Sequence, residues 1–120
     1  IECRILAEDP ARDWVPASGT ITKFVMPGGP GVRVDSHVHP GYVVPSSYDS
    51  LLAKVVCWGG TRSEALSRTR RALDECVIEG VDCNLSFLRW VLSDVAFERG
   101  DYNLDSFTSA AQPDVADGVG

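Results

Sequence analysis

Two histidines and a carboxylate lie close together in the chain as Asp35, His37 and His39. In an extended strand, positions i, i+2 and i+4 point to the same side, so these three side chains can converge on a metal ion. A zinc or iron site also requires ligands from elsewhere, and an H-x-H pair is more common on an exposed strand or loop. We therefore favour an exposed pair over a metal site.

Arg4 is the second candidate, because it lies between a cysteine and an isoleucine in an apolar stretch near the start of the chain. A guanidinium is costly to bury unless an anion or a carboxylate meets it. Neighbouring Glu2, Glu8 or Asp9 would make Arg4 part of a structural ion pair. An anionic ligand presented by another domain would make it functional, and the residues alone leave both interpretations open.

One predicted helix has a local basic bias from Arg62, Arg68, Arg70 and Arg71. Glu64 with Arg68, and Arg70 with Asp74, have the i,i+4 spacing of favourable pairs on a solvated helix surface. A partner-facing surface is the alternative, since arginine forks suit protein interfaces. The usual nucleophile, zincin and phosphate-loop motifs are absent from the sequence, and we interpret the run Gly28-Gly29-Pro30-Gly31 as a turn.

Composition narrows the class of protein. With 120 residues and 44% hydrophobic content, the chain has apolar material for one compact core. A formal charge of -6 argues against binding to nucleic acid or to acidic membranes. No apolar run approaches the roughly 20 residues of a membrane helix, so we expect a soluble chain.

The four cysteines are Cys3, Cys57, Cys76 and Cys83. Their spacing matches neither paired CxxC zinc ligands nor a dense secreted scaffold, and each lies beside apolar residues. We expect reduced, buried thiols and hence a cytoplasmic protein, with paired disulfides as the lesser alternative.

Strands are predicted first along the chain. Residues 1–7 alternate, with Ile1, Cys3 and Ile5 on one side, and residues 11–19 form a loop anchored in the core by Trp14 and Val15. Residues 20–26 and 32–35 are rich in β-formers and are separated by the Pro- and Gly-rich turn at 27–31. The apolar stretch within 48–58 is typical of a central strand covered on both sides.

Helices are predicted afterwards. Thr61 and Glu64 form a T-x-x-E capping box, and apolar residues recur at helical spacing up to Gly80, a plausible C-terminal cap. Asp82 or Asn84 can cap a second helix that ends near residues 93–94. A short third helix is expected at 104–110, and a frayed end at 112–120. Strands first and helices afterwards indicate an α+β fold with an antiparallel sheet.

Several ordered blocks closely resemble the C-terminal domain of biotin carboxylases: IECRILAEDP (1–10), PxSGxIT (16–22), PGGPGVRVDS (27–36), YDSLLAK (48–54) and GVxxN (80–84). The resemblance extends to about residue 107 and implies a domain at 1–111 followed by a flexible tail at 112–120. Because the chain begins within a strand and without methionine, we expect it to be part of a larger protein, and the resemblance implies that this protein is an ATP-grasp enzyme.

The resemblance implies ATP- and bicarbonate-dependent carboxylation of biotin on a carrier protein. This is the first half-reaction of acetyl-CoA carboxylase in fatty acid synthesis. The implied partners are the protein's own N-terminal and ATP-grasp domains, a homodimer partner, the biotin carboxyl carrier protein and a carboxyltransferase. Mg²⁺ or Mn²⁺, the phosphate-binding lysines and the general base would belong to the preceding domains, so residues 1–120 alone are expected to be inactive.

By the same resemblance, Arg4 matches the family arginine that contacts bicarbonate and biotin. Leu104 falls where an aliphatic residue forms one wall of the adenine pocket. Arg33, Asp49 and Arg68 match positions near the dimer interface. The sequence departs from some bacterial members at Pro30, where an aromatic interface residue occurs, and at His39, where tyrosine occurs.

Other functions stay open at this stage. The chain can be a non-catalytic interaction module, in which Arg4 forms a structural ion pair and the arginine-rich helix is a docking face. It can also belong to a propionyl-CoA- or pyruvate-type carboxylase, or to a related ligase that shares only this terminal domain.

Overall fold

The computed structural model describes residues 1–46 and 50–93. Asp49, Leu104, the expected helix at 104–110 and the tail at 112–120 lie outside the described residues. Within the described part, strands precede and alternate with two α-helices, and the antiparallel α+β class expected from the sequence is confirmed.

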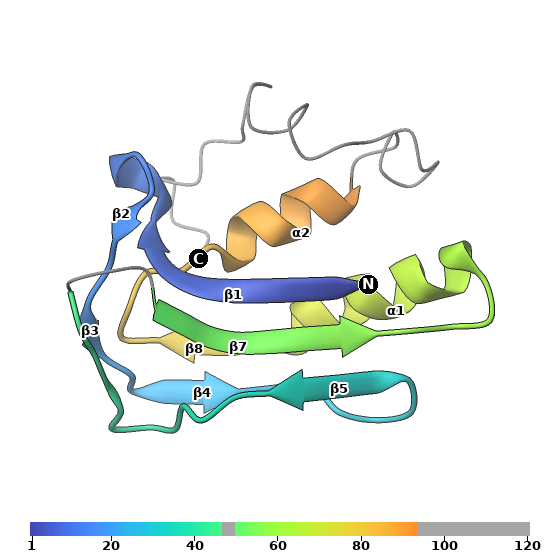
Figure 1. The fold of residues 1–120 in the computed structure, drawn as a ribbon, viewed down its shortest axis with the longest axis horizontal. Coiled ribbons are helices and arrows are strands. Elements are labelled where there is room, and N and C mark those ends of the chain that lie inside the picture. The colour runs from blue at the N-terminus through green and yellow to red at the C-terminus, as the bar shows by residue number, and fades with distance from the viewer. Residues whose placement is uncertain (47–49, 94–120) are drawn as a thin grey trace.

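The main sheet has four strands in the order β2-β1-β7-β5 (Figure 1). Their bounds are Glu2–Asp9 for β1, Val15–Pro16 for β2, Val32–Asp35 for β5 and Ser50–Cys57 for β7. Every neighbouring pair is antiparallel. The two long strands, β1 and β7, therefore lie side by side at the centre, and their pairing shifts register between Ile5 and Leu6.

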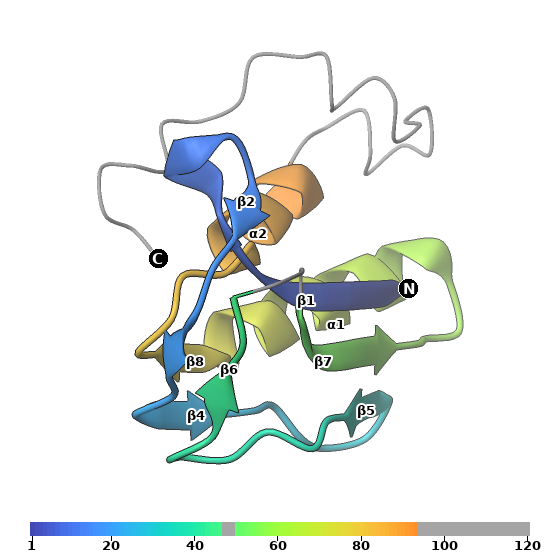
Figure 2. The same cartoon turned by 60° about the vertical axis from the view of Figure 1, so that its left-hand side comes forward.

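Two short strand pairs extend the fold. β3 (Gly19–Thr20) pairs with β6 (Val43–Val44), and β4 (Lys23–Val25) pairs with β8 (Val77–Glu79). Figure 2 shows both pairs beyond the end of the main sheet that lies away from the N-terminus. The single strand expected at 20–26 is thus divided, because the Ile21 amide bonds to Tyr42 and the Thr22 amide bonds to Glu79.

Helix α1 spans Arg62–Glu75 and α2 spans Leu85–Ser93. The Thr61 half of the predicted capping box is confirmed, since the Thr61 hydroxyl accepts the Glu64 amide at 3.1 Å. The Glu64 carboxylate pairs with Arg68. The predicted end at Gly80 is wrong. Cys76 is already extended, and the residues after it form β8, whose backbone groups pair with β4 instead of continuing the helix.

The core lies on one face of the main sheet. Cys3, Ile5 and Ala7 of β1 and Val55 and Cys57 of β7 are buried there. They pack with apolar residues of α1 and α2, including Leu66, Leu73, Leu85 and Leu92. In Figure 1, α1 lies behind β7 and α2 runs beside β1.

The other face of β7 is open, so the prediction of a strand covered on both sides is wrong. Leu51 is 40% exposed, and Lys54 and Val56 are only partly buried. The long apolar stretch arises partly from the register shift, which places both Leu52 and Ala53 in the core.

The loop after β1 contains a short 3₁₀ helix at Pro10–Arg12 and two left-handed residues, Asp13 and Trp14. The Trp14 ring packs edge-on against Phe87 of α2, with centroids 5.0 Å apart. Trp14 is therefore a partial anchor, whereas Val15 is 45% exposed and the prediction that it enters the core is wrong. Over residues 1–46 and 50–93, neither helix has the length and apolarity needed to cross a membrane.

Candidate functional site

Arg4 lies on the open face of the sheet. Because successive side chains of a strand alternate, burial of Cys3 and Ile5 on the core side directs Arg4 outward. Its side chain is 61% exposed, and Nε donates a hydrogen bond to Glu2 Oε2 at 3.0 Å. The local ion pair foreseen for Arg4 therefore exists, and the guanidinium is not in the core.

The charged neighbours of Glu2 shift the pKa of its carboxylate. The hydrogen bond from Arg4 lowers the pKa of Glu2 below its ordinary value, against an opposing effect of desolvation. The positive charges of Lys54 and Arg33 act in the same direction as the hydrogen bond. Glu2 is thus ionised at neutral pH and holds one donor of the guanidinium.

Strand register arranges charges in rows across β1, β7 and β5. One row places Arg4 opposite Lys54 and Lys54 opposite Asp35, while the next row has Glu2 and Arg33 on either side of Val56. Directly opposite residues share a face of a sheet, so both rows lie on the open face. Arg33 and Asp35, two residues apart on β5, share this face and form an ion pair at 3.3 Å.

The main chain around Arg4 is fixed from its other edge by Asn84, the residue just before α2. Asn84 Oδ1 accepts the Leu6 amide at 2.8 Å, and its Nδ2 donates to the Arg4 carbonyl at 3.0 Å. The Asn84 amide also donates to the Leu6 carbonyl at 3.2 Å. The sequence predicts this side chain as a possible helix cap, whereas in the structure it hydrogen-bonds to the backbone of β1.

Arg68, one of the predicted interface residues, belongs to α1, and its side chain reaches the end of β7. It donates from Nη1 to the Trp58 carbonyl and from Nη2 to Glu64 Oε1, the latter at 3.3 Å, so the expected i,i+4 pair is confirmed. A Cβ at Gly31 would overlap the Arg68 guanidinium, so the two groups are in close contact. Arg33 lies on the open face, and Asp49 and Leu104 are outside the described residues.

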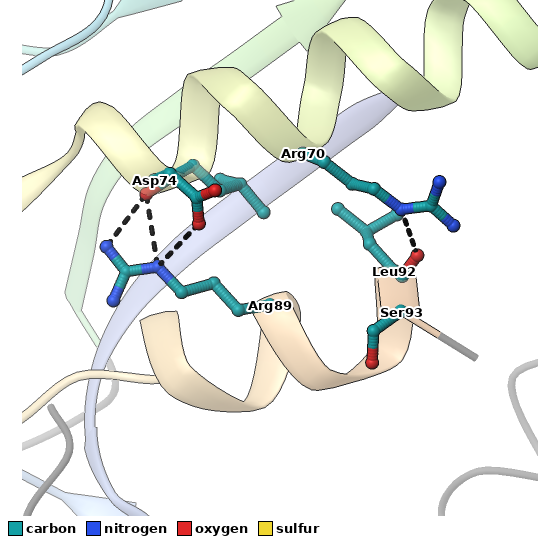
Figure 3. Close-up of a pocket in the computed structure, with 6 residues that line it drawn as sticks. Arg70, Asp74, Arg89, Leu92 and Ser93 are labelled. Atoms are coloured by element: carbon teal, nitrogen blue, oxygen red, sulfur yellow. Dashed lines mark hydrogen bonds and ion pairs between the residues drawn. The ribbon is translucent and has the colours of Figure 1, made fainter.

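Two other arginines join α1 to α2 (Figure 3). Arg89 of α2 donates to the Leu73 and Cys76 carbonyls at the end of α1, and Arg70 of α1 donates to the Leu92 carbonyl at the end of α2. A cavity of about 150 Å³ lies between them, lined by Arg70, Leu73, Asp74, Arg89, Leu92 and Ser93. These arginines bind carbonyls at the C-terminal ends of the helices, where the regular i,i+4 amide partners are missing, which indicates a structural role.

The histidines do not form the strand arrangement that would gather metal ligands, because β5 ends at Asp35. The His37 ring nitrogen is 3.2 Å from the Tyr42 hydroxyl, and the His39 ring nitrogen is 2.7 Å from the Pro40 carbonyl. Residues 1–46 and 50–93 contain no group of three His, Cys, Asp or Glu placed to hold a metal.

All four cysteines are free thiols, and three of them are fully buried. Burial raises the pKa of Cys3 to about 11 and that of Cys76 to about 12, chiefly by desolvation, and it also raises the pKa of the partly buried Cys83. A neutral thiol is a poor nucleophile and a poor metal ligand, so these groups serve packing.

This fold is that of a domain from biotin-dependent carboxylases. Residues 2–108 match the biotin carboxylase C-terminal domain family, and the chain belongs to that family. It is 48% identical over 103 residues to biotin carboxylase 1 of Bacillus subtilis (strain 168), covering 86% of this chain and 23% of the relative.

The chain is also similar to carboxylases that act on other substrates. The chain is 46% identical over 101 residues to a pyruvate carboxylase subunit of Methanothermobacter thermautotrophicus, covering 84% of the chain and 21% of the relative. The biotin carboxylase domain dimer of Hydrogenobacter thermophilus 2-oxoglutarate carboxylase, solved with MgADP, ADP and bicarbonate, aligns with a TM-score of 0.83 at 35% identity. That alignment covers 92% of this chain and 26% of the solved one. The chain thus spans about a quarter of the length of these relatives.

Proposed function

We propose that this chain acts as the C-terminal domain of a biotin carboxylase and contributes Arg4 to the ATP- and bicarbonate-dependent carboxylation of biotin on a carrier protein. The observation that carries the proposal is the outward guanidinium of Arg4 on a strand whose backbone Asn84 fixes. Family membership and the bicarbonate named in the solved relative support it.

The role proposed for Arg4 is charge stabilisation. Removal of a proton from the ureido nitrogen of biotin leaves an enolate-like oxyanion, and a fixed guanidinium lowers the free energy of that charge. Arginine has five N–H donors in a rigid fork, of which Nε is used by Glu2. Within the described residues the two Nη groups make no hydrogen bond, so they are the donors offered to an anion.

Other parts of the full-length enzyme complete this proposal. The preceding N-terminal and ATP-grasp domains would bind ATP with Mg²⁺ or Mn²⁺ and supply the general base, with Leu104 against the adenine ring. Arg33, Asp49 and Arg68 would take part in a homodimer interface, in keeping with the dimer named for the solved relative. We place the enzyme in the cytoplasm, with a biotin carrier protein and a carboxyltransferase as partners.

Acetyl-CoA carboxylase of fatty acid synthesis is the first candidate for the whole system. A carboxylase of pyruvate type is the second, and the similarity to a subunit of pyruvate carboxylase favours it specifically. Both candidates share the biotin carboxylation step and differ in the carboxyltransferase and in the acceptor to which it transfers the carboxyl group.

The test is the variant Arg4→Ala in the full-length enzyme. We expect kcat for biotin carboxylation to fall by about 10²–10³-fold, the usual cost of losing one oxyanion donor, while the KM for ATP changes less than about twofold. The matched control is Arg12→Ala, because Arg12 is 80% exposed in a loop and is not part of the charged face. Wild-type turnover of Arg4→Ala would contradict the proposal.

The 120-residue chain alone should give no ATP-dependent carboxylation of free biotin. This expectation follows because the proposed ATP and metal ligands belong to the preceding domains. Detectable bicarbonate-dependent product formation by the purified chain, measured with labelled bicarbonate, would count against this division of roles.

A further inference from the structure

Lys54 occupies the centre of the open face of the sheet. It lies on β7, between β1 and β5, with Arg4 directly opposite on one side and Asp35 on the other. Its side chain is half-buried, whereas Arg4 and Asp35 at either side are exposed. Any molecule that approaches Arg4 from the open face therefore also meets Lys54.

The position of Lys54 directly opposite Arg4 lowers the stability of the sheet when no anion is bound. Like charges directly opposite each other in an antiparallel pair destabilise the sheet. A residue whose position lowers stability, with no better packing to compensate, is often a functional residue. The chain has 17 acidic residues against 11 basic ones, so two adjacent cations on an outer face run against its overall composition.

The charge of Lys54 lowers the pKa of Glu2, but both neighbouring carboxylates make their short contacts with other cations. Glu2 is hydrogen-bonded to Arg4, and Asp35 is paired with Arg33. Lys54 itself forms no hydrogen bond or ion pair with any residue in 1–46 or 50–93. With three cations and two carboxylates, the two rows carry one surplus positive charge, and the unpaired member is Lys54.

We propose that Lys54 is a second anion-binding residue beside Arg4, and that its ammonium and the Arg4 guanidinium together bind bicarbonate. This inference rests on the proposed function and adds a residue to the same site. Opposite Cβ atoms of an antiparallel pair are about 4.5–5.5 Å apart, so two long cationic side chains there can reach one small anion. The guanidinium contributes paired, planar N–H donors and the ammonium contributes a compact charge.

The bound anion also explains why the two cations are tolerated. A negative charge between them converts a repulsion into two attractions, so the stability that the empty face loses is recovered in the complex. Removing the charge of Lys54 should therefore weaken anion binding and leave folding stability unchanged or higher. A purely structural lysine, paired with Asp35, would affect both in the same direction.

The experiment uses the full-length carboxylase with the variants Lys54→Met, Lys54→Gln and Lys54→Arg. Met keeps the length of the apolar stem without the charge, Gln keeps polarity, and Arg keeps the charge. We expect the KM for bicarbonate to rise about tenfold in the Met and Gln variants, with the KM for ATP unchanged, and to stay within about threefold in the Arg variant. The melting temperature of the Met variant should equal or exceed that of the wild type.

Lys23→Met is the matched control, since Lys23 is exposed on a different strand pair and its loss removes the same charge. The inference is overturned if the Met or Gln variant keeps a bicarbonate KM within twofold of the wild type. It is also overturned if Lys54→Met lowers the melting temperature and impairs all kinetic constants equally.

Arg4→Ala in the same assay separates this inference from the proposed function. If Arg4→Ala is impaired and Lys54→Met is normal, only the role of Lys54 is refuted. Normal turnover in both variants refutes the proposed function.

Discussion

Arg4 is positioned mainly through its main chain. Its side chain is largely exposed and is held by one hydrogen bond to Glu2, whereas its backbone pairs with β7 on one edge and with Asn84 on the other. The register shift between Ile5 and Leu6 falls at the point where Asn84 bonds to β1. The amide of Asn84 thus acts as a substitute strand partner beside the proposed catalytic residue.

Replacement of Asn84 by alanine should destabilise the chain by about 2 kcal/mol. The side chain is buried, and its loss leaves the Leu6 amide and the Arg4 carbonyl without these partners. Urea denaturation measures the change in the free energy of unfolding. Asn84→Asp retains the acceptor for Leu6 and loses the donor to Arg4, so it should also destabilise. Exposed Ser67→Ala is the control, and equal stability of all three variants would contradict this role.

At the scale of elements, two glycines allow separate segments to meet. Gly19 is the first residue of β3, and Gly80 follows β8. Their backbones are in close contact, and both have positive φ, at 151° and 107°. A Cβ at Gly80 would overlap the Thr20 carbonyl oxygen. Gly80 therefore belongs to the junction between β8 and β3, where only glycine fits, rather than to the end of α1.

Gly80→Ala should lower the free energy of unfolding by about 2 kcal/mol or more, because it adds a steric overlap to a φ that residues other than glycine rarely adopt. Thermal unfolding followed by circular dichroism measures the loss. Gly28→Ala makes a matched control, since a Cβ at Gly28 has no neighbour within 4 Å and its φ is not in the left-handed region. A Gly80→Ala variant as stable as Gly28→Ala would show that the junction can relax.

Some of these elements can be predicted from the sequence and others cannot, and the difference is whether their partners are near or far along the chain. The start of α1 was predictable because Thr61 caps Glu64 through a contact three residues away. Its end was not, because Val77–Glu79 leaves the helix to pair with Lys23–Val25, and such pairing depends on residues far away in the sequence. The sequence predicts Gly80 and Asn84 as local helix caps, whereas the groups that each contacts lie on distant strands.

At the scale of the whole molecule, the two faces of the sheet have different roles. The helices cover one face and are joined to each other by Arg70 and Arg89, and the other face presents alternating charges. The alternation along β1 and β5 was readable from the sequence. The position of Lys54 opposite Arg4 was not, because a shift of one residue in the pairing of β1 with β7 would send Lys54 to another neighbour and face.

The core face has a consequence for stability at high pH. Desolvation raises the pKa of Cys3 to about 11 and that of Cys76 to about 12, whereas a thiol in the unfolded chain titrates near 8.5. A raised folded-state pKa means that the folded chain retains protons that the unfolded chain releases. The contribution of these thiols is therefore complete below about pH 8.5 and is lost as the pH rises toward 11 to 12.

Between pH 8 and pH 10 the wild-type chain should lose on the order of 4 kcal/mol of unfolding free energy through these two thiols, about 2 kcal/mol from each. The double variant Cys3→Ala and Cys76→Ala should be less stable at pH 8, because it leaves cavities, but its stability should fall less steeply with pH. Urea titrations at both pH values give the two slopes, and other titrating groups cancel in their difference. Equal slopes for the wild type and the variant would mean that the thiols ionise inside the core without cost, and the packing role assigned to them would then be wrong.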